Sequence, residues 1–185
     1  MQRDLVVRAR KGDHDAFAAL AAAAMPRLDG AAWLILRDAE QAKDAVQNAL
    51  VRAWRDLPTL RDPDRFDQWL RKLLVRACID EARRLRRHRA NVELTNIDIS
   101  TTAGMESTVA DRDQIERGFV RLPPEMRAVL VLHHYFDLPL PDVAATLAIP
   151  LGTAKSRLHR SIGLLRAALD ADARVRPEIS EGRPA

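Results

Sequence analysis

Apolar residues recur at intervals of three and four along most of the chain, and this spacing predicts helices. In the first half the pattern runs from Asp4 to Leu20 with a turn at Gly12-Asp13, then from Asp38 to Pro58, and again from Phe66 to Leu85. Proline ends the second segment because it lacks the amide hydrogen that a helix interior needs. We therefore expect a compact all-helical domain over residues 1–89.

A change of composition over residues 90–114 separates this domain from a second one. Thr, Ser, Asn and acidic residues dominate there without a helical period, which is typical of a flexible linker. Helical spacing returns over residues 115–169. Three breaks interrupt it: Leu122-Pro123-Pro124, Asp137–Pro141 and Ala148-Ile149-Pro150. Residues 170–185 contain two prolines and a glycine, and we expect a disordered tail. The predicted fold class is all-α, with two small helical domains joined by a flexible linker.

Within the second domain, the segment Asp142–Leu165 has the pattern of a helix-turn-helix. A short helix that includes Val143 precedes a three-residue turn, and the next helix keeps an apolar stripe. The stripe consists of Ala154, Leu158, Ile162 and Leu165. Small residues, Ala144 and Ala145, should let the two helices cross closely. The second helix is basic on its other faces, as in helices that enter the major groove of DNA.

The net charge of +4 conceals an uneven distribution of charged residues. Residues 71–89 hold eight basic and two acidic side chains, residues 152–166 hold four basic and no acidic ones, and residues 90–117 hold two basic and six acidic ones. Two basic helices on either side of an acidic spacer fit two points of contact on one polyanion. A solvated helix face is the alternative for either run alone. A membrane-surface helix is disfavoured, because the arginine-rich end lacks a bulky apolar face.

Cysteine usage and hydropathy bear on the compartment. Cys78 is the single cysteine, so the chain has no internal disulfide, and a reducing compartment is the simplest location. The N-terminus lacks the apolar core of a signal peptide. The longest apolar stretch, Ala16 to Met25, is too short to span a bilayer and predicts a buried helix face. We expect a cytoplasmic protein without membrane insertion.

No arrangement of residues indicates an enzyme. The chain has no glycine-rich phosphate loop, and Cys78 lies between apolar neighbours, as an inert buried thiol does. His133, His134 and His159 could bind a metal in principle, but adjacent helical residues point apart. We expect no catalytic residue, no metal and no cofactor.

The second half resembles a known family through the sequence LPPEMRAVLVLHHYFDLPLPDVAATLAIPLGTAKSRLHRSIGLLR. It is similar to the minus-35-binding domain of bacterial RNA polymerase sigma factors of the extracytoplasmic-function (ECF) class, above all at Gly152–Leu158. Pro139 and Ala148 stand where the family commonly has a capping serine and a turn glycine. The resemblance implies that six residues contact minus-35 DNA: Thr153, Lys155, Ser156, Arg157, His159 and Arg160.

The first half resembles the same family independently. RKGDHDAF is similar to its opening helix turn, and DAEQAKDAVQNALVRAWRDL to the helix that docks on the clamp coiled coil of core polymerase. The resemblance implies four core polymerase contacts: Asp44, Gln47, Asn48 and Val51. These residues fall at i, i+3, i+4 and i+7 beside the apolar face, so a merely solvated face is the alternative from spacing alone. Trp54 continues the apolar face, and we expect it in the core.

FDQWL followed by ACIDEARRLRR resembles the part of the family that recognises and opens the minus-10 element. The implied DNA contacts lie in the loop Leu60–Arg65 and along the following helix: Arg61, Asp62, Arg65, Arg71, Lys72, Arg76, Arg83, Arg84 and Arg87. Phe66 and Trp69 lie three residues apart, which favours a packed core pair. Asp80 is predicted to pair with Arg83 or Arg84 on the same helix.

Together the two resemblances, over residues 5–87 and 118–167, imply an ECF sigma factor. Such a protein binds core RNA polymerase and promoter DNA, recognises the minus-10 and minus-35 elements, and commonly works under an anti-sigma factor. A stand-alone helix-turn-helix regulator is the alternative. It should hold duplex promoter DNA by itself, whereas a sigma factor should need core polymerase.

Overall fold

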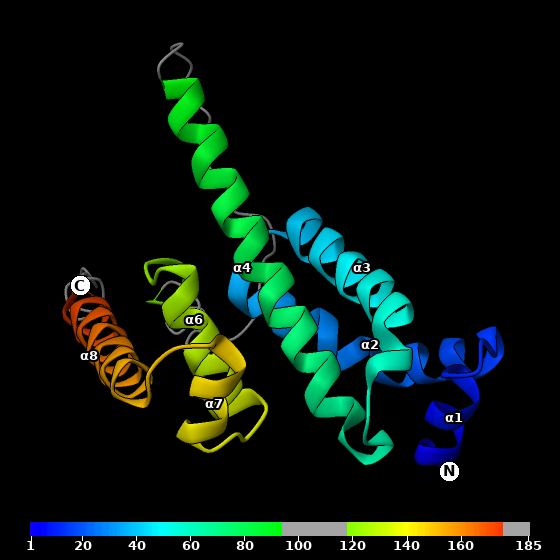
Figure 1. Cartoon of the computed structure of the whole chain (residues 1–185). Helices are drawn as coiled ribbons and strands as arrows, with labels where there is room; N and C mark the ends of the chain where they lie inside the picture. Colours follow the sequence, from blue (N-terminus) through cyan, green and yellow to red (C-terminus); the bar gives the residue numbers. More distant parts are fainter. Residues whose placement is uncertain (94–117, 176–185) are drawn as a thin grey trace, which may run out of the picture.

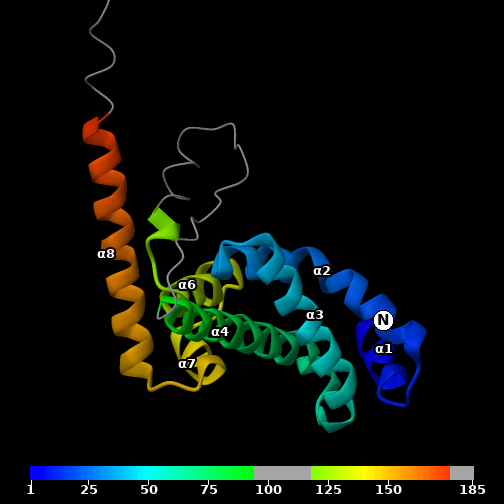
Figure 2. The same ribbon diagram turned by 90° about the horizontal axis from the view of Figure 1, so that it is seen from above.

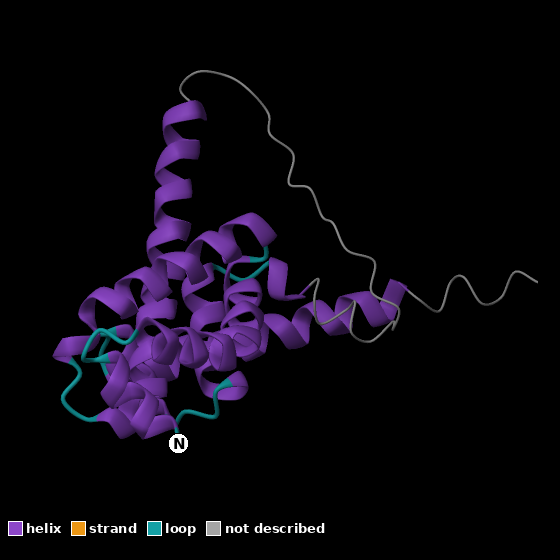
Figure 3. Ribbon diagram, turned by 90° about the vertical axis from the view of Figure 1, so that its right-hand side faces the viewer, coloured by secondary structure: helices purple, strands orange, loops and turns teal. Residues whose placement is uncertain are grey.

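The computed structural model describes residues 1–93 and 118–175 (Figure 1). In these two ranges all regular structure is helical and no strand is present (Figure 3). The prediction of an all-α chain with two helical domains is therefore confirmed. Residues 94–114 of the expected linker and 176–185 of the expected tail lie outside the described residues.

The first half consists of long helices that begin at the positions the sequence pattern indicates. Its elements are α1 (Gln2–Ala9), α2 (His14–Leu36), α3 (Ala39–Asp56), η1 (Leu57–Thr59), η2 (Pro63–Arg65) and α4 (Phe66–Glu93). Asp13 caps α2 by accepting a hydrogen bond from the Ala16 amide at 2.9 Å, and Asp38 caps α3 through the Gln41 amide at 3.0 Å. Both carboxylates satisfy amides that have no partner inside the helix.

Helix α2 is longer than the apolar stretch in the sequence suggested, because it continues through Pro26 to Leu36. Pro26 has no amide hydrogen to donate to the Ala22 carbonyl. Both residues are exposed, so water can hydrogen-bond this carbonyl instead. By length and composition the whole of α2 could cross a membrane, although the stretch Ala16–Met25 is only part of it. However, α2 contacts α1, α3 and α4 and supplies buried residues such as Ile35, as a core helix does.

The core of the first half depends on small side chains between the helices. Ala42, Ala45, Ala49 and Ala53 of α3 are all buried where α3 meets α2 and α4. Larger apolar residues of α4, including the fully buried Phe66, pack on this surface. Alanine therefore allows close helix packing in a chain in which only 4% of residues are aromatic.

The second half is a smaller group of helices. Residues 118–120 are helical, followed by α6 (Pro124–Leu130), the π-helical turn η3 (Val131–Tyr135), α7 (Leu140–Leu147) and α8 (Leu151–Val175). Phe136 closes η3 by donating its amide hydrogen to the Val131 carbonyl at 3.0 Å. Helix α8 continues past the expected end near Leu169, and α4 continues to Glu93.

The two halves pack against each other across α2 and α4. Helix α6 and turn η3 contact α2, while α7 lies along α4 (Figures 1 and 2). Arg86 of α4 donates to both carboxylate oxygens of Glu125 at 2.8 and 2.9 Å. A Cβ at Gly30 of α2 would lie 2.6 Å from the Tyr135 hydroxyl, so glycine permits this close approach. The contacts between the halves are thus specific, and buried residues of both halves belong to one apolar cluster.

The turn between α7 and α8 contains a strained backbone position. Ala148 ends α7 with φ +52 and ψ +48, in the left-handed region that favours glycine. Its amide nevertheless donates to the Ala145 carbonyl at 3.4 Å, and the Ile149 amide donates to the Ala144 carbonyl at 3.0 Å. The turn geometry expected for a helix-turn-helix is therefore formed without the usual glycine.

Replacing Ala148 by glycine should stabilise the protein. We expect Ala148→Gly to raise the free energy of unfolding by about 1 kcal/mol, because it removes the Cβ clash of the left-handed conformation. Ala145→Gly, in the exposed middle of α7, is the matched control and should lower that free energy by roughly 0.5–1 kcal/mol. Denaturant titration of both variants measures the difference. A loss of stability in Ala148→Gly as large as in the control would contradict the prediction.

Candidate nucleic-acid and polymerase interfaces

Helices α7 and α8 form the predicted helix-turn-helix. Val143, Ala144 and Ala154 are buried where the two helices meet, and Leu158 continues the buried stripe. Ala145 is exposed, so Ala144 alone of the two small residues lies in the crossing. The polar start of α8 is thereby held in a fixed orientation on the surface.

The predicted minus-35 residues divide into two groups. Lys155, Ser156, His159 and Arg160 are exposed, whereas Thr153 and Arg157 are half-buried. The Ser156 hydroxyl donates to the Thr153 carbonyl at 3.0 Å, which leaves its oxygen free to accept. The four exposed side chains lie within the first three turns of α8.

The predicted minus-10 residues do not form a single cluster. Arg61, Asp62 and Arg65 are exposed in the segment before α4, where Asp62 caps η2 through the Asp64 amide at 3.1 Å. Arg83, Arg84 and Arg87 lie more than four turns further along α4, roughly 25 Å away by the helical rise. Arg76 is exposed between these groups, and Lys72 is half-buried. Helix α4 thus presents its positive charge over most of its length.

Arg71 is the predicted minus-10 residue that the structure places against the second half. Its guanidinium carbon lies 5.3 Å from the centre of the Phe136 ring, and the side chain is half-buried. Sequence spacing gives no information about this contact, because Phe136 is far along the chain.

The expected pairing of Asp80 is wrong. Asp80 accepts a hydrogen bond from Arg52 of α3 at 3.3 Å, across the helix interface. Glu81, buried beside it, pairs with Arg84 at 2.6 Å, and this hydrogen bond raises the pKa of Arg84. A one-residue step on a helix turns a side chain by about 100°, so Asp80 faces α3 while Glu81 faces the next turn of α4.

The four predicted polymerase residues are exposed on α3 and border two different grooves. Asp44, Gln47 and Asn48 line a polar groove of about 540 Å³ between α3 and α4, together with Arg84 and Arg87. Predicted polymerase and DNA residues therefore share one surface.

A second groove, between α2 and α3, is apolar and was not found from the sequence. Its volume is about 860 Å³, and Met25, Trp33, Val46, Leu50 and Val51 are among the residues that line it. Val51 is 60% exposed, which is unusual for a large apolar side chain. Val46 is buried and Leu50 packs against the core, and both also line this groove. The pairing of α3 with α2 that forms the groove is a long-range feature.

Several aromatic and histidine residues have structural roles. Trp54 is half-buried rather than in the core, where we expected it, and its ring centre lies 4.4 Å from that of His14 and 5.1 Å from that of Phe17. Phe66 is buried next to Trp69. The His133 Nδ1 lies 2.8 Å from the Leu138 carbonyl and fixes the turn after η3. Within the described ranges, no group of three or more His, Cys, Asp or Glu side chains could hold a metal ion.

A helix-turn-helix unit attached to a basic helical unit defines a DNA-binding transcription protein, and comparisons with known proteins give its family. The family model for Sigma-70 region 2 matches residues 20–88, and that for Sigma-70 region 4 matches residues 112–165. The ECF RNA polymerase sigma factor SigM of Mycobacterium tuberculosis is 33% identical over 151 residues, 81% of this chain and 75% of SigM. SigW of Bacillus subtilis, also an ECF RNA polymerase sigma factor, is 26% identical over 182 residues, 90% of this chain and 95% of SigW.

Solved structures agree with this assignment. CnrH, determined in complex with the cytosolic domain of CnrY, is 27% identical and superposes with a TM-score of 0.63 over 92% of this chain and 98% of CnrH. The sigma factor RpoE from Bartonella quintana, determined with the anti-sigma factor NepR, has the same fold, with a TM-score of 0.68 at 21% identity over 84% of this chain and 98% of RpoE. The chain belongs to the ECF class of RNA polymerase sigma factors.

Cys78 should be unreactive in the folded protein. Burial raises the pKa of its thiol from 9.0 to about 12, so the thiolate that reacts with alkylating agents is scarce. We expect iodoacetamide at about pH 8 to leave the native protein unmodified and to label it fully in concentrated guanidinium chloride, as mass spectrometry measures. The raised pKa also means that stability should fall as the pH rises above 9 toward 12. Rapid labelling of the native protein would contradict the burial of Cys78.

Proposed function

We propose that this protein directs core RNA polymerase to promoters through three surfaces, with no catalysis of its own. The observation that carries the proposal is the presence of two separate basic surfaces, on α4 and on α8, together with an apolar groove between α2 and α3. The first domain, residues 1–89, binds polymerase and opens the minus-10 element. The second, residues 115–169, reads the minus-35 duplex. This function requires the protein to act in the cytoplasm, where polymerase and promoter DNA are.

Core polymerase binds to the exposed side of α3. Asp44, Gln47 and Asn48 supply polar contacts, while Val51 contributes apolar area at the edge of the groove between α2 and α3. An interface with an apolar centre and a polar rim gives affinity together with specificity. A polar rim also suits a partner that must be released after initiation.

Minus-10 DNA binds along α4 and the segment before it. Arg61, Asp62 and Arg65 contact bases of the opened strand, and their support is that all three are exposed in the segment that begins between η1 and η2 and ends at the start of α4. The basic residues of α4 bind phosphates: Arg71, Lys72, Arg76, Arg83, Arg84 and Arg87. Capture of unpaired bases, rather than a chemical step, provides the driving force for promoter opening.

Minus-35 DNA binds at the start of α8 in the major groove. Lys155 and Arg160 donate to base edges or phosphates, and Ser156, His159 and Thr153 add polar contacts. Arg157 is half-buried and close enough to Glu125 to interact with it electrostatically, so its contact is with the phosphate backbone at the edge of the site.

An anti-sigma factor is the expected regulator. The structures of CnrH and RpoE that resemble this chain were determined with CnrY and NepR. We infer that a protein of this kind binds the present chain and covers the same grooves and basic surfaces.

The proposed function predicts polymerase-dependent initiation. Addition of the protein to core polymerase with a promoter library should give promoter-specific transcripts that core polymerase alone does not make. Arg160→Ala should reduce use of promoters with a minus-35 element about tenfold, because it removes one base or phosphate contact. Arg166→Ala, also exposed on α8 but further along it, is the matched control and should have little effect. A folded protein that directs no initiation, or that binds duplex promoters equally well without polymerase, would refute the sigma function.

The polymerase surface is tested by a binding experiment. Asp44→Ala combined with Gln47→Ala should weaken binding to core polymerase about threefold to tenfold, because rim contacts are individually modest. Glu40→Ala, an exposed acid at the start of the same helix, should leave the affinity unchanged. Fluorescence titration with labelled protein measures the dissociation constants. Unchanged affinity in the double variant would mean that polymerase does not bind the exposed side of α3.

A further inference from the structure

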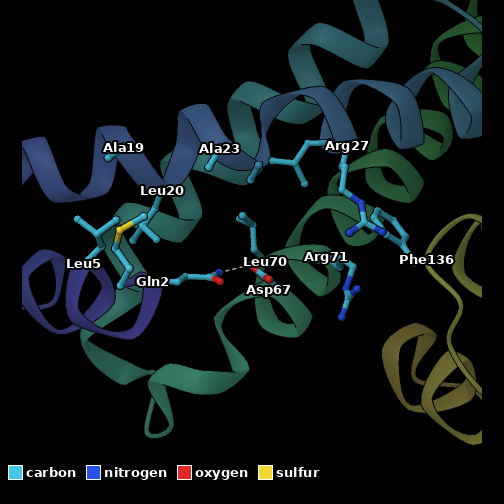
Figure 4. Close-up of a pocket in the computed structure, with 13 residues that line it drawn as sticks. Gln2, Leu5, Ala19, Leu20, Ala23, Arg27, Asp67, Leu70, Arg71 and Phe136 are labelled. Carbon is cyan, nitrogen blue, oxygen red and sulfur yellow. Dashed lines mark hydrogen bonds between the residues drawn. The ribbon is translucent and has the colours of Figure 1, made fainter.

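The aromatic ring of Phe136 lies close to two arginines of the first half. The guanidinium carbon of Arg27, on α2, lies 5.7 Å from the ring centre, and that of Arg71, on α4, lies 5.3 Å away (Figure 4). Both distances are within the range of a cation–π interaction. Phe136 itself is only 5% exposed, so the second half buries its ring against these two cations.

The two arginines have little negative charge around them. Within residues 1–93 and 118–175, neither guanidinium forms an ion pair, and the buried Nε of Arg71 has no hydrogen-bond partner. The Asp67 carboxylate interacts electrostatically with Arg71, but it accepts its hydrogen bond from Gln2 at 2.6 Å. Burial lowers the pKa of Arg71, Asp67 opposes this effect, and the nearby charge of Arg27 adds to it. An anion at this position would therefore be stabilised by both arginines.

A cavity adjoins the arginines. Its volume is about 310 Å³, which is at the lower end of the range for ligand pockets. Leu5, Leu20 and Leu70 are among the residues that give it an apolar wall, and Gln2 and Asp67 provide hydrogen-bonding groups (Figure 4). Arg27, Arg71 and Phe136 also line the cavity, so a ligand would contact the cations and the apolar wall together.

An unpaired nucleotide has the chemistry that this site accepts. Its base presents a flat aromatic face, and proteins bind such bases by stacking on arginine as well as on aromatic side chains. Its phosphate supplies the negative charge that the two arginines lack. Phe136 provides only the aromatic part of such a ligand.

We propose that Arg27 and Arg71 form a binding site for an unpaired nucleotide of single-stranded DNA, and that Phe136 occupies this site when the two halves are packed together. The proposal rests on the proposed role in promoter opening and adds Arg27, which is outside the surfaces assigned above. Because the ring and the base compete for the same cations, the guanidinium faces that the ring covers become available only when the second half moves away. Packing of the halves therefore weakens binding of single-stranded DNA by the free protein.

The test uses the full chain without polymerase and a fluorescein-labelled 12-nucleotide oligothymidylate. We expect Phe136→Ala to tighten binding, measured by fluorescence anisotropy, about fivefold, because it vacates the site. Adding Arg27→Gln and Arg71→Gln to this variant should abolish the gain. Adding Lys11→Gln instead removes a positive charge at an exposed position of the first half and should preserve most of the gain.

An abasic oligonucleotide of the same length separates base stacking from general charge attraction. Its affinity should be the same for the wild type and Phe136→Ala. Equal tightening of both oligonucleotides would overturn the nucleotide site, as would a Phe136→Ala variant that binds oligothymidylate no better than the wild type. Thermal denaturation shows whether Phe136→Ala is folded. If it is not, Phe136→Leu keeps apolar bulk without the ring and should give a smaller gain in affinity in the same direction. No gain in a folded Phe136→Leu would then reject the proposal.

These measurements are independent of the transcription assay. A protein that initiates transcription with core polymerase but shows no gain from loss of the Phe136 ring retains the sigma function and lacks this site. A protein that shows the gain but directs no initiation has the nucleotide site without the sigma function.

Discussion

The structure depends on helix α4, which must bury one face and leave another face charged. Its apolar residues Phe66, Leu70 and Leu74 are among the most buried in the chain and pack where α2 and α3 meet. The same helix includes the basic segment 71–89 and contacts α6 and α7 of the second half. Because one rigid helix does all of this, the polymerase surface, the basic DNA surface and the contact between the halves have a fixed geometry relative to one another.

This arrangement makes the interface between the halves rich in arginine. Arg127 of α6 is buried, and burial together with the charge of Arg37 lowers its pKa to about 10. Two of its nitrogens have no hydrogen-bond partner, which is costly for a buried cation. The Glu125 carboxylate offsets part of this cost because its charge raises the pKa of Arg127, whereas the charge of Arg86, which pairs with Glu125, lowers that pKa. The interface therefore combines apolar contacts, which join buried residues of both halves into one cluster, with poorly compensated cations.

Local sequence signals were sufficient for most of the fold. Asp13 and Asp38 marked helix starts correctly because a cap depends on residues three apart, and the proline pair at Pro123-Pro124 marked the start of α6 in the same way. Pro26 lies inside α2 without ending it, since a proline on an exposed helix face is tolerated. The helix-turn-helix followed from apolar spacing, and it forms even though Ala148 adopts a left-handed conformation that glycine would adopt more easily.

Features that depend on contacts between distant segments were not accessible to the same reasoning. The pairing of Asp80 with Arg52 joins residues 28 apart, and the groove beside Val51 is lined by residues of both α2 and α3. Spacing placed Arg71 on a basic face and gave no sign that Phe136 would cover it. Periodicity states which face of a helix is polar, but which other element meets that face is decided by packing.

The few aromatic residues of the second half show what such packing can add. Tyr135 and Phe136 are adjacent, with ring centres 5.2 Å apart, and both face the first half: one meets Gly30 of α2 and the other meets Arg27 and Arg71. Leucine at these positions would bury comparable apolar area without attracting a guanidinium. A ring that binds arginines through its π face can be exchanged for a nucleobase, which has the same kind of face. The aromatic residues at this interface therefore couple the packing of the two halves to the exposure of the arginine surface that binds single-stranded DNA.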